Sequence, residues 1–453
     1  MKILAQIIGK LVAFVGEKLG KGSSMPGRIA LKIDKNLLSK YTMPDLVIAV
    51  TGSSGKTSTS YMIAKILKEA GYTVAHNVEG ANLKYGITTL MLKNTTLRGN
   101  FKKDACVIEV DERYTEQVFE DIKPTHLVVC NITRDQPPRH GNYEKVYNVI
   151  KNAIKKCNKL NLILNGDDPL MQKLAQEIDG GKRKIKYFGV GKCVESLESP
   201  LNTVLDNIYC PKCYSKLQYE YVSFLNVGKY NCPTCDFTHP QINYLAKEID
   251  NTRLSIEDNI ITPFNNIVYT YYNIAAAYAV AKILEINSDV ICKTIEDMNL
   301  VHKRAQTIEC GNKQYYILTG KNENAPSYNQ AILHTMKDTD KKIIAFGYDY
   351  ISLRYPFEDM SWMYDIDFEF LFKSEVESFV CVGPFAKNIA TRIKLAGFEE
   401  NKIICIKNIS ELPTAIQNMN SSKVYAILNM GVDDTLKNTL DYINTRKWGK
   451  YEY

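Results

Sequence analysis

The stretch that decides the fold class is Val47-Ile48-Ala49-Val50-Thr51-Gly52-Ser53-Ser54-Gly55-Lys56-Thr57-Ser58. Leu46 to Val50 form a short continuous apolar run, which predicts a buried strand. After the turn of small residues, apolar side chains recur at helical spacing until Gly71 ends the pattern; they are Met62, Ile63, Ile66, Leu67 and Ala70. A strand, a tight turn and a helix in this order indicate an α/β sheet.

The turn has the composition of a phosphate-binding loop. Gly52 and Gly55 allow a tight bend that points backbone N–H groups at one anion, and the helix N-terminus adds its partial positive charge. Lys56 can reach a β- or γ-phosphate, and the Thr57 hydroxyl can ligate Mg²⁺. The alternative is an ordinary strand-to-helix turn. The predicted phosphate-binding residues are Thr51, Gly52, Ser53, Ser54, Gly55, Lys56, Thr57 and Ser58.

Composition sets the broad class of protein. A chain of 453 residues, 45% hydrophobic and 24% charged, predicts two or three globular domains. The net charge of +7 is a mild bias toward anionic ligands and does not by itself indicate a nucleic-acid binder. No cleavable signal and no apolar run long enough for a membrane span is visible, so we expect reduced thiols in a cytoplasmic protein.

The order of predicted elements gives three regions. Residues 1–45 hold an N-terminal helix and a lead-in, residues 46–305 a first α/β domain, and residues 306–453 a second, Rossmann-like α/β domain. The first 19 residues place apolar side chains on one helical face; they are Ile3, Leu4, Ile7, Ile8, Leu11, Val12 and Val15. We expect a helix packed on the body, with a membrane-surface helix as the alternative. The stretch from residue 20 to 27 is expected to be a loop.

Four of the twelve cysteines are clustered in a metal-ligand pattern. Cys210 and Cys213 form one C-x-x-C pair, and Cys232 and Cys235 form a second pair eighteen residues further on. Four thiolates at this spacing can close a tetrahedral Zn²⁺ site with no position left for water, which predicts a structural zinc ribbon inserted at residues 206–240.

Polar residues follow two further predicted strands. Glu109 ends the strand Cys106–Val110, where a carboxylate beside the phosphate loop can hold Mg²⁺. A solvated acidic turn is the alternative. Asn131 and Asp135 follow the strand Leu127–Cys130 as candidate nucleotide or metal-water contacts, with Arg134 as a phosphate partner.

These motifs together resemble one family. The pattern T-G-x-x-G-K-[ST] at residues 51–57, Glu109-Val-Asp-Glu112, Asn131-Ile-x-Arg-Asp-Gln136, Leu164-Asn-x-Asp-Asp-Pro169 and Asn273-Ile-Ala-Ala resemble the central ATPase domain of the Mur ligases. Within that family, Arg-Asp-Gln, the four-cysteine ribbon and the divergent C-terminal domain are similar to the MurT proteins.

The resemblance implies an enzyme, an ATP-dependent carbon–nitrogen ligase with glutamine as amide donor. It implies amidation of the D-glutamate α-carboxylate in the lipid II peptide stem, at the inner face of the cell membrane, with ammonia from a GatD-type glutaminase partner. By the same resemblance Lys56 and Thr57 hold ATP phosphate and Mg²⁺, Glu109 ligates Mg²⁺, Asn131 touches the nucleotide and Arg304 seats ATP.

The resemblance also implies a role for an aspartate of the C-terminal domain. That residue completes the partner's glutaminase site, and Asp359 is the best match. The segments 302–306 and 348–354 depart from the family pattern, which leaves Asp349 and Asp365 as rivals of Asp359.

Two other functions compete with this interpretation. One is a stand-alone Mur or folylpolyglutamate-type ligase that adds an amino acid without a partner. The other is a nucleic-acid-binding ribbon at residues 209–236, against which the lack of a concentrated basic and aromatic patch argues.

Overall fold

The computed structural model describes residues 1–18, 23–77, 81–133, 142–179, 183–200, 208–250, 252–298, 305–321, 323–348, 360–429 and 431–448. These residues form two compact units. Unit 1 contains the described residues up to 298, and unit 2 contains those from 305 onward. Among the described residues, none of the helices combines the length and the hydropathy that a membrane span needs.

Unit 1 is built on a nine-stranded sheet with the strand order β11-β10-β9-β6-β5-β4-β1-β3-β2. The strands from β2 to β9 in this order run parallel, and β10 and β11 close the edge as antiparallel strands. The predicted α/β class with a largely parallel sheet is therefore confirmed. The strands are β1 (Leu46–Thr51), β2 (Val74–His76), β3 (Ala105–Glu109), β4 (His126–Val129), β5 (Asn161–Asn165), β6 (Ile185–Val190), β9 (Tyr244–Asp250), β10 (Arg253–Ile256) and β11 (Asn259–Ile261).

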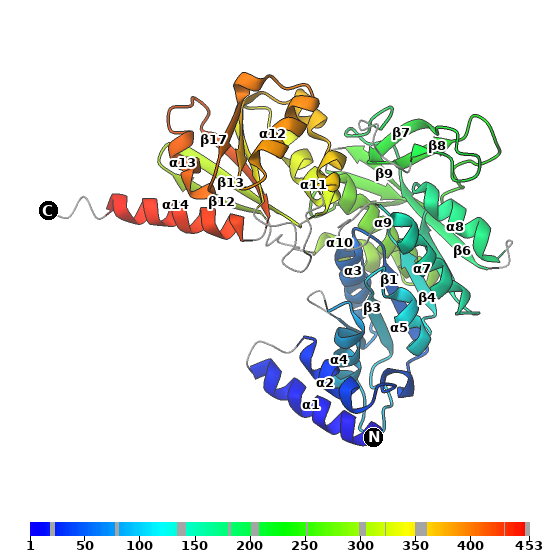
Figure 1. Cartoon of the computed structure of the whole chain (residues 1–453). Coiled ribbons are helices and arrows are strands. Elements are labelled where there is room, and N and C mark those ends of the chain that lie inside the picture. The colour runs from blue at the N-terminus through cyan, green and yellow to red at the C-terminus, as the bar shows by residue number, and fades with distance from the viewer. Residues whose placement is uncertain are drawn as a thin grey trace. The chain divides into compact units, whose positions relative to one another are not determined.

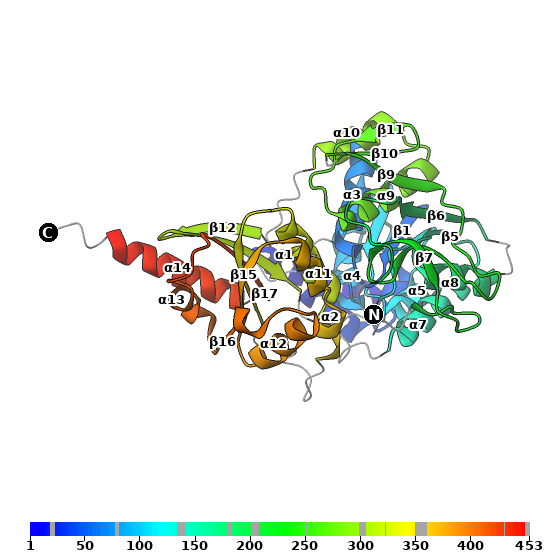
Figure 2. The same cartoon turned by 90° about the horizontal axis from the view of Figure 1, so that it is seen from above.

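Helices cover both faces of this sheet. Figures 1 and 2 show α3, α9 and α10 on one face and α5, α7 and α8 on the other. The helices of unit 1 are α1 (Lys2–Lys18), α2 (Met25–Ile33), α3 (Lys56–Glu69), α4 (Lys84–Asn94), α5 (Thr115–Asp121), α7 (Tyr143–Lys155), α8 (Pro169–Asp179), α9 (Val268–Ile283) and α10 (Ser288–Glu296), with a short 3₁₀ turn η1 (Leu38–Lys40).

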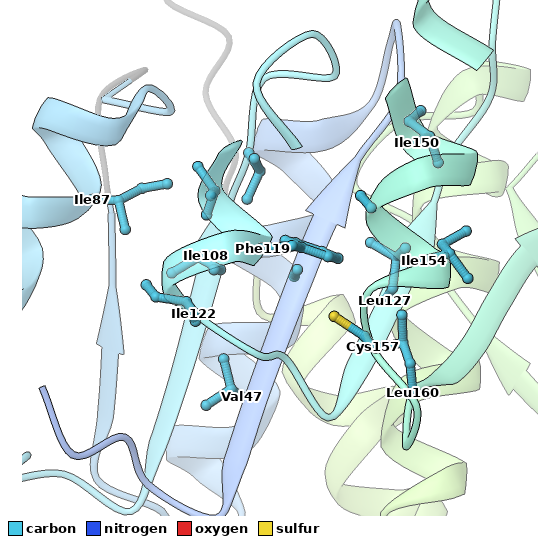
Figure 3. Packing of buried hydrophobic residues seen from close by; sticks show 14 of the residues in the cluster. Val47, Ile87, Ile108, Phe119, Ile122, Leu127, Ile150, Ile154, Cys157 and Leu160 are labelled. Carbon is cyan, nitrogen blue, oxygen red and sulfur yellow. The ribbon is translucent and has the colours of Figure 1, made fainter. Parts of the chain in front are cut away.

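The main apolar core of unit 1 lies between the sheet and one helical layer. Figure 3 shows Phe119 of α5 and Ile150 and Ile154 of α7 packed over Ile108 of β3 and Leu127 of β4. All five side chains are fully buried. Burial on both faces explains why β1, β3 and β4 read as continuous apolar runs rather than alternating ones. This core fixes the carboxyl ends of three adjacent strands next to each other.

A small two-stranded ribbon follows β6. Strand β7 (Gln218–Phe224) pairs antiparallel with β8 (Val227–Asn231), and the two cysteine pairs flank this hairpin. The four cysteines share a separate small core with Leu217, Tyr219, Tyr230 and Phe237.

Unit 2 contains a six-stranded sheet with the order β12-β13-β17-β14-β15-β16. Strand β12 is antiparallel to β13, and the other neighbours are parallel. The strands are β12 (Ala305–Cys310), β13 (Lys313–Gly320), β14 (Lys342–Gly347), β15 (Val376–Val382), β16 (Ile403–Ile406) and β17 (Lys423–Asn429). The helical elements are α11 (Ala325–Met336), η3 (Ser361–Asp365), η4 (Phe368–Lys373), α12 (Ala386–Leu395), η5 (Glu400–Lys402), η6 (Ile409–Glu411), α13 (Leu412–Ala415) and α14 (Val432–Trp448).

One expectation about local structure is wrong. A loop was expected at residues 20–27, but helix α2 already begins at Met25. Pro26 suits the first turn of a helix because its missing N–H has no partner there in any case. Gly27 is required by packing, since a Cβ atom at this position would lie 2.0 Å from the carbonyl oxygen of Tyr85 in α4.

Candidate functional site

The loop between β1 and α3 has the geometry of an anion cradle. Gly55 is the N-cap of α3 with φ of 88°, and a Cβ atom there would lie 2.4 Å from Oδ1 of Asn273. Gly52 has φ of 130°, and its Cβ would lie 2.8 Å from the carbonyl oxygen of Asn131. Both positions therefore need glycine. In the described part of the chain no side chain caps α3, so the N–H groups of its first turn point to where an anion can bind.

Asn131 and Thr133, which follow β4, hold this loop in shape. The Ser53 N–H donates to the Asn131 carbonyl at 2.9 Å, and the Ser54 N–H donates to Asn131 Oδ1 at 3.0 Å. The Asn131 side-chain amide donates back to the Ser54 carbonyl at 3.2 Å. Ser53 Oγ donates to the Thr133 carbonyl and accepts from the Thr133 N–H. Asn131, predicted to touch the nucleotide, thus braces the phosphate loop.

Lys56 lies folded back along the first turn of α3. Its Nζ is 2.8 Å from Oε2 of Glu112, and it also donates to the carbonyls of Gly52 and Ser53. Lysine and glutamate are both buried. No role was predicted for Glu112, although its position three residues after Glu109 could have indicated that it lies at the same site.

Glu109 ends β3 directly beside the start of the loop, since it is the register partner of Val50. It is 2% exposed, and its Oε1 accepts from the Asn82 side-chain amide at 2.9 Å. The Asn77 side chain pairs with both backbone groups of Glu109. The carboxylate is therefore fixed in direction. Thr51, at the end of β1, is buried and donates to the Val110 carbonyl, so it ties β1 to β3 rather than facing the loop.

The remaining loop residues differ in exposure. Thr57 is exposed on the first turn of α3, and Ser54 and Ser58 are half-buried. Asn273 of α9 belongs to one of the sequence motifs, but no role was predicted for it. The structure places its Oδ1 next to Gly55 and in contact with the Thr59 hydroxyl at 3.2 Å. Because Thr59 and Asn273 are 214 residues apart, no local pattern could reveal this contact.

Two aspartates link the loop after β5 to the site. Asp168 accepts from the Ile132 N–H at 2.8 Å and from the Leu170 N–H at 2.9 Å. Burial raises the pKa of Asp168 to about 7. Asp167 accepts from His239 Nε2 at 2.7 Å and from the Tyr272 hydroxyl at 2.6 Å. His239 follows the ribbon, so a buried polar network joins the ribbon to the segment that braces the phosphate loop.

The predicted metal ligands Cys210, Cys213, Cys232 and Cys235 come together. Their Sγ atoms all lie within 4.8 Å of one another, with Cys210 and Cys235 3.6 Å apart. The N–H groups of Lys212 and Thr234 donate to the Sγ atoms of Cys210 and Cys232 at 3.4 Å. Such donors favour thiolates, and four thiolates are the donor set of a structural zinc site. The residues present therefore fit Zn²⁺.

Several predicted residues lie outside the described residues. They are Asp349, Asp359, Arg134, Asp135 and Arg304. Asp365, the other rival of Asp359, lies among the described residues. It ends η3 and is 2% exposed in unit 2.

The chain was compared with known proteins. Residues 50–211 match the family model described as Mur ligase middle domain, and residues 322–430 match the model described as MurT ligase C-terminal. The chain is 30% identical over 401 residues to the lipid II isoglutaminyl synthase (glutamine-hydrolyzing) subunit MurT of Staphylococcus aureus (strain COL), covering 87% of each protein. It is 29% identical to the MurT subunit of Streptococcus pneumoniae (strain ATCC BAA-255 / R6), covering 94% of this chain and 93% of that protein.

A solved structure shares the fold. The pseudomurein peptide ligase type C from Methanothermus fervidus matches with a TM-score of 0.70 at 20% identity, over 90% of this chain and 81% of that one. At this identity the likeness concerns the fold alone.

Proposed function

The chain belongs to the MurT family of Mur ligase-type proteins, and from this premise we propose that it is the ATP-using subunit of a lipid II isoglutaminyl synthase. In this proposal it amidates the α-carboxylate of D-glutamate in the lipid II peptide stem, in the cytoplasm at the inner face of the cell membrane. The observation that carries the proposal is the phosphate loop. It has two required glycines, an N-terminus of α3 open to an anion, and a buried lysine at its centre.

The chemistry requires activation because a carboxylate is a poor electrophile without a leaving group. The terminal phosphoryl group of ATP is transferred to a carboxylate oxygen, which gives an acyl phosphate and ADP. The lone pair of ammonia then attacks the carbonyl carbon. The bond from that carbon to the phosphate oxygen breaks, phosphate leaves, and the nitrogen loses one proton. Catalysis of this kind rests on positioning and on neutralising phosphate charge.

The residues divide this work as follows. The N–H groups at the start of α3, in the loop Thr51–Ser58, bind the phosphates, and Lys56 moves from Glu112 to the transferred group. Thr57 and Glu109 offer the oxygen donors that Mg²⁺ prefers, and the bound ion neutralises phosphate charge. Asn131 keeps the loop in its binding conformation, and Arg304 is proposed to seat the nucleotide.

The ribbon is proposed to hold one structural Zn²⁺ per chain. The four thiolates leave no open position for a substrate, so the ion stabilises the fold of the ribbon. Cys213→Ser is expected to lose the metal and to make the ribbon sensitive to protease, and Cys405→Ser, at an exposed cysteine outside the cluster, serves as the control. Metal analysis of protein purified without chelator checks this, and absence of zinc from the unaltered protein contradicts it.

The partner is proposed to be a GatD-type glutaminase whose Cys-His pair receives an aspartate from this chain. A carboxylate can fix the tautomer and the orientation of an imidazole. Asp359 is the candidate and Asp349 its rival. The burial of Asp365 in unit 2 argues against a role for that residue across an interface.

The proposed reaction is tested with the assembled complex. Asp359→Asn is expected to keep amidation driven by added ammonium and to lose amidation driven by glutamine, because the ATP site is untouched. Asp349→Asn is the matched variant. If it alone loses the glutamine-driven reaction, the role belongs to Asp349. If the unaltered complex transfers an amino acid instead of ammonia, the protein is a ligase of the stand-alone type.

A further inference from the structure

Helix α1 sits on unit 1 with its polar side inward. Gln6 is fully buried; its amide donates to Thr95 Oγ1 at 2.7 Å and its Oε1 accepts from the Tyr41 hydroxyl at 2.7 Å. Lys10 Nζ donates to the carbonyls of Leu92 and Thr95. Lysine and glutamine side chains are normally found on the solvent side of a surface helix. In α1 they anchor the helix to the body instead.

Small residues let α1 approach its neighbours closely. Its other buried positions are Ala5, Gly9, Ala13 and Gly16. A Cβ atom at Gly9 would lie 2.7 Å from the Leu92 side chain and 3.1 Å from Ala30 Cβ. Figure 1 shows α1 at the edge of unit 1, against α2 and α4, with no labelled element of that unit on its other side. The side that faces the body is therefore filled by small and polar residues.

The opposite side of α1 carries a continuous apolar stripe. Its members follow helical spacing and are 47–61% exposed; they are Ile3, Leu4, Ile7, Leu11, Phe14 and Val15. Large contiguous apolar patches are uncommon on soluble monomers and mark contact surfaces. A helix with this pattern suits the boundary between headgroups and acyl chains of a membrane. With 17 residues, α1 is long enough to lie along that boundary.

The net positive charge of the segment that contains α1 selects among the candidate occupants. The first 45 residues hold eight lysines and arginines against three acidic residues. Two of these acids form ion pairs, Glu17 with Lys93 and Asp34 with Lys40. Lys18 Nζ lies 4.7 Å from the centroid of the Phe14 ring, directly at the stripe. A symmetric dimer through α1 would bring two basic regions together, whereas anionic headgroups complement them.

We propose that α1 docks the protein on a lipid surface with anionic headgroups, with the apolar stripe inserted among the acyl chains. This docking depends on α1 and its surroundings and does not require the proposed reaction. Binding to lipid requires no change in the fold of α1, because the side that faces the body is already packed.

The test is co-sedimentation of the full-length chain with vesicles. We expect binding to equimolar phosphatidylglycerol and phosphatidylcholine, weaker binding to phosphatidylcholine alone, and weakening by salt. Ile7→Asp/Leu11→Asp is expected to lower the affinity about tenfold or more, because two inserted side chains become charged. Val194→Asp/Ile260→Asp, at exposed apolar residues elsewhere in unit 1, is the matched control and should bind as the parent does.

Thermal unfolding and ATP turnover of the α1 variant should match those of the parent, since the stripe is exposed and distant in sequence from the phosphate loop. Equal vesicle binding by parent and α1 variant overturns the proposal. So does a parent that ignores anionic vesicles. A concentration-dependent dimer, or a bound glutaminase subunit, that only the α1 variant loses would assign the stripe to protein contact instead and also overturn it.

Discussion

Both units contain a parallel strand that leads through a short loop into a helix, but the two helix N-termini differ. Strand β1 leads into α3, whose N-cap is Gly55, with no side-chain cap among the described residues. Strand β13 leads into α11, whose N-cap is Asn324, and the Asn324 side chain accepts from the Ser327 N–H at 2.8 Å. One N–H group in the first turn of α11 thus has a side-chain partner. The first turn of α3 has no side-chain cap among the described residues, which is compatible with the proposed phosphate site.

The difference lies in the cap residue rather than in the topology. A side-chain cap satisfies one of the N–H groups that a phosphate would use, so capping competes with anion binding at one helix end. Glycine at the cap provides the left-handed conformation without competing for those donors. Four predictions test this comparison.

Lys56→Ala is expected to have the largest effect. Removing the ammonium at the centre of the loop should lower the rate of ADP formation about 10³-fold. Secondary structure by circular dichroism should stay unchanged, because Nζ contacts Glu112 and loop carbonyls rather than the apolar core. Lys68→Ala, on the exposed last turn of the same helix, is the control and should keep the parent's rate. A Lys56→Ala protein with the parent's rate contradicts the assignment of the loop.

Gly55→Ala is expected to lower ATP affinity about tenfold or more and the free energy of unfolding by about 1–3 kcal/mol. The new Cβ meets Asn273 Oδ1 in a left-handed backbone conformation. Gly71→Ala is the matched control, since Gly71 has φ of 93° and nothing within 4 Å of the added atom. It should lose stability but not ATP affinity, as measured by calorimetric titration and urea unfolding. Equal ATP affinity of the two variants would contradict the cradle geometry.

Asp168→Asn tests the carboxyl group that accepts a hydrogen bond from the segment after β4, and the readout is the pH dependence of stability. The pKa of Asp168 is about 7 in the folded protein, above its ordinary value of 3.8. The folded state thus holds a proton that the unfolded state releases. Its contribution makes the free energy of unfolding fall as pH rises from about 4 to about 7. The free energy of unfolding of the variant should depend less steeply on pH. It should also be lower by about 1 kcal/mol, because one acceptor for a backbone N–H is lost.

Urea unfolding at several pH values, followed by circular dichroism, measures this slope. Asp45→Asn, at an exposed aspartate just before β1, is the control. An unchanged slope in the Asp168→Asn protein would mean that the carboxyl is ionised across the whole window.

Asn324→Ala is expected to have the smallest effect. Loss of the cap should lower the free energy of unfolding of unit 2 by about 1 kcal/mol without changing ATP affinity. Both tryptophans, Trp362 and Trp448, belong to unit 2, so their fluorescence reports on this unit. Asn287→Ala, which removes the equivalent cap of α10 in unit 1, is the control and should leave that signal unchanged. A reduced ATP affinity of the Asn324→Ala protein would contradict the proposal that ATP binds at the N-terminus of α3 and not at that of α11.

Much of the fold could be predicted from the sequence because its signals are local. Apolar runs such as Leu46–Val50 are typical of strands buried between two helical layers. The antiparallel edge formed by β9, β10 and β11 was not predicted, because β10 and β11 are short and only their pairing with β9 gives them a place in the sheet.

The sequence by itself predicted the glycine-containing turn between β1 and α3 and the cysteine cluster. The groups of the turn, and the two cysteines of each C-x-x-C pair, are close together because they are close in sequence. The two pairs flank the hairpin of β7 and β8, which brings them to each other. Only the tertiary structure decided that Glu112 holds Lys56, that Asn273 lies against Gly55 and that Asp168 supports the segment after β4. These contacts join strand ends and helices that are far apart in sequence.

Helix α1 shows the same limit most clearly. The sequence indicated an amphipathic helix, and the ordinary expectation places its apolar face on the body. The structure packs the opposite face, with Gly9 against α2 and α4 and Gln6 satisfied by buried partners. Periodicity specifies that a helix has two faces. Which face is buried depends on the shape and the polar groups of the surface that receives it, and that surface forms only when the chain has folded.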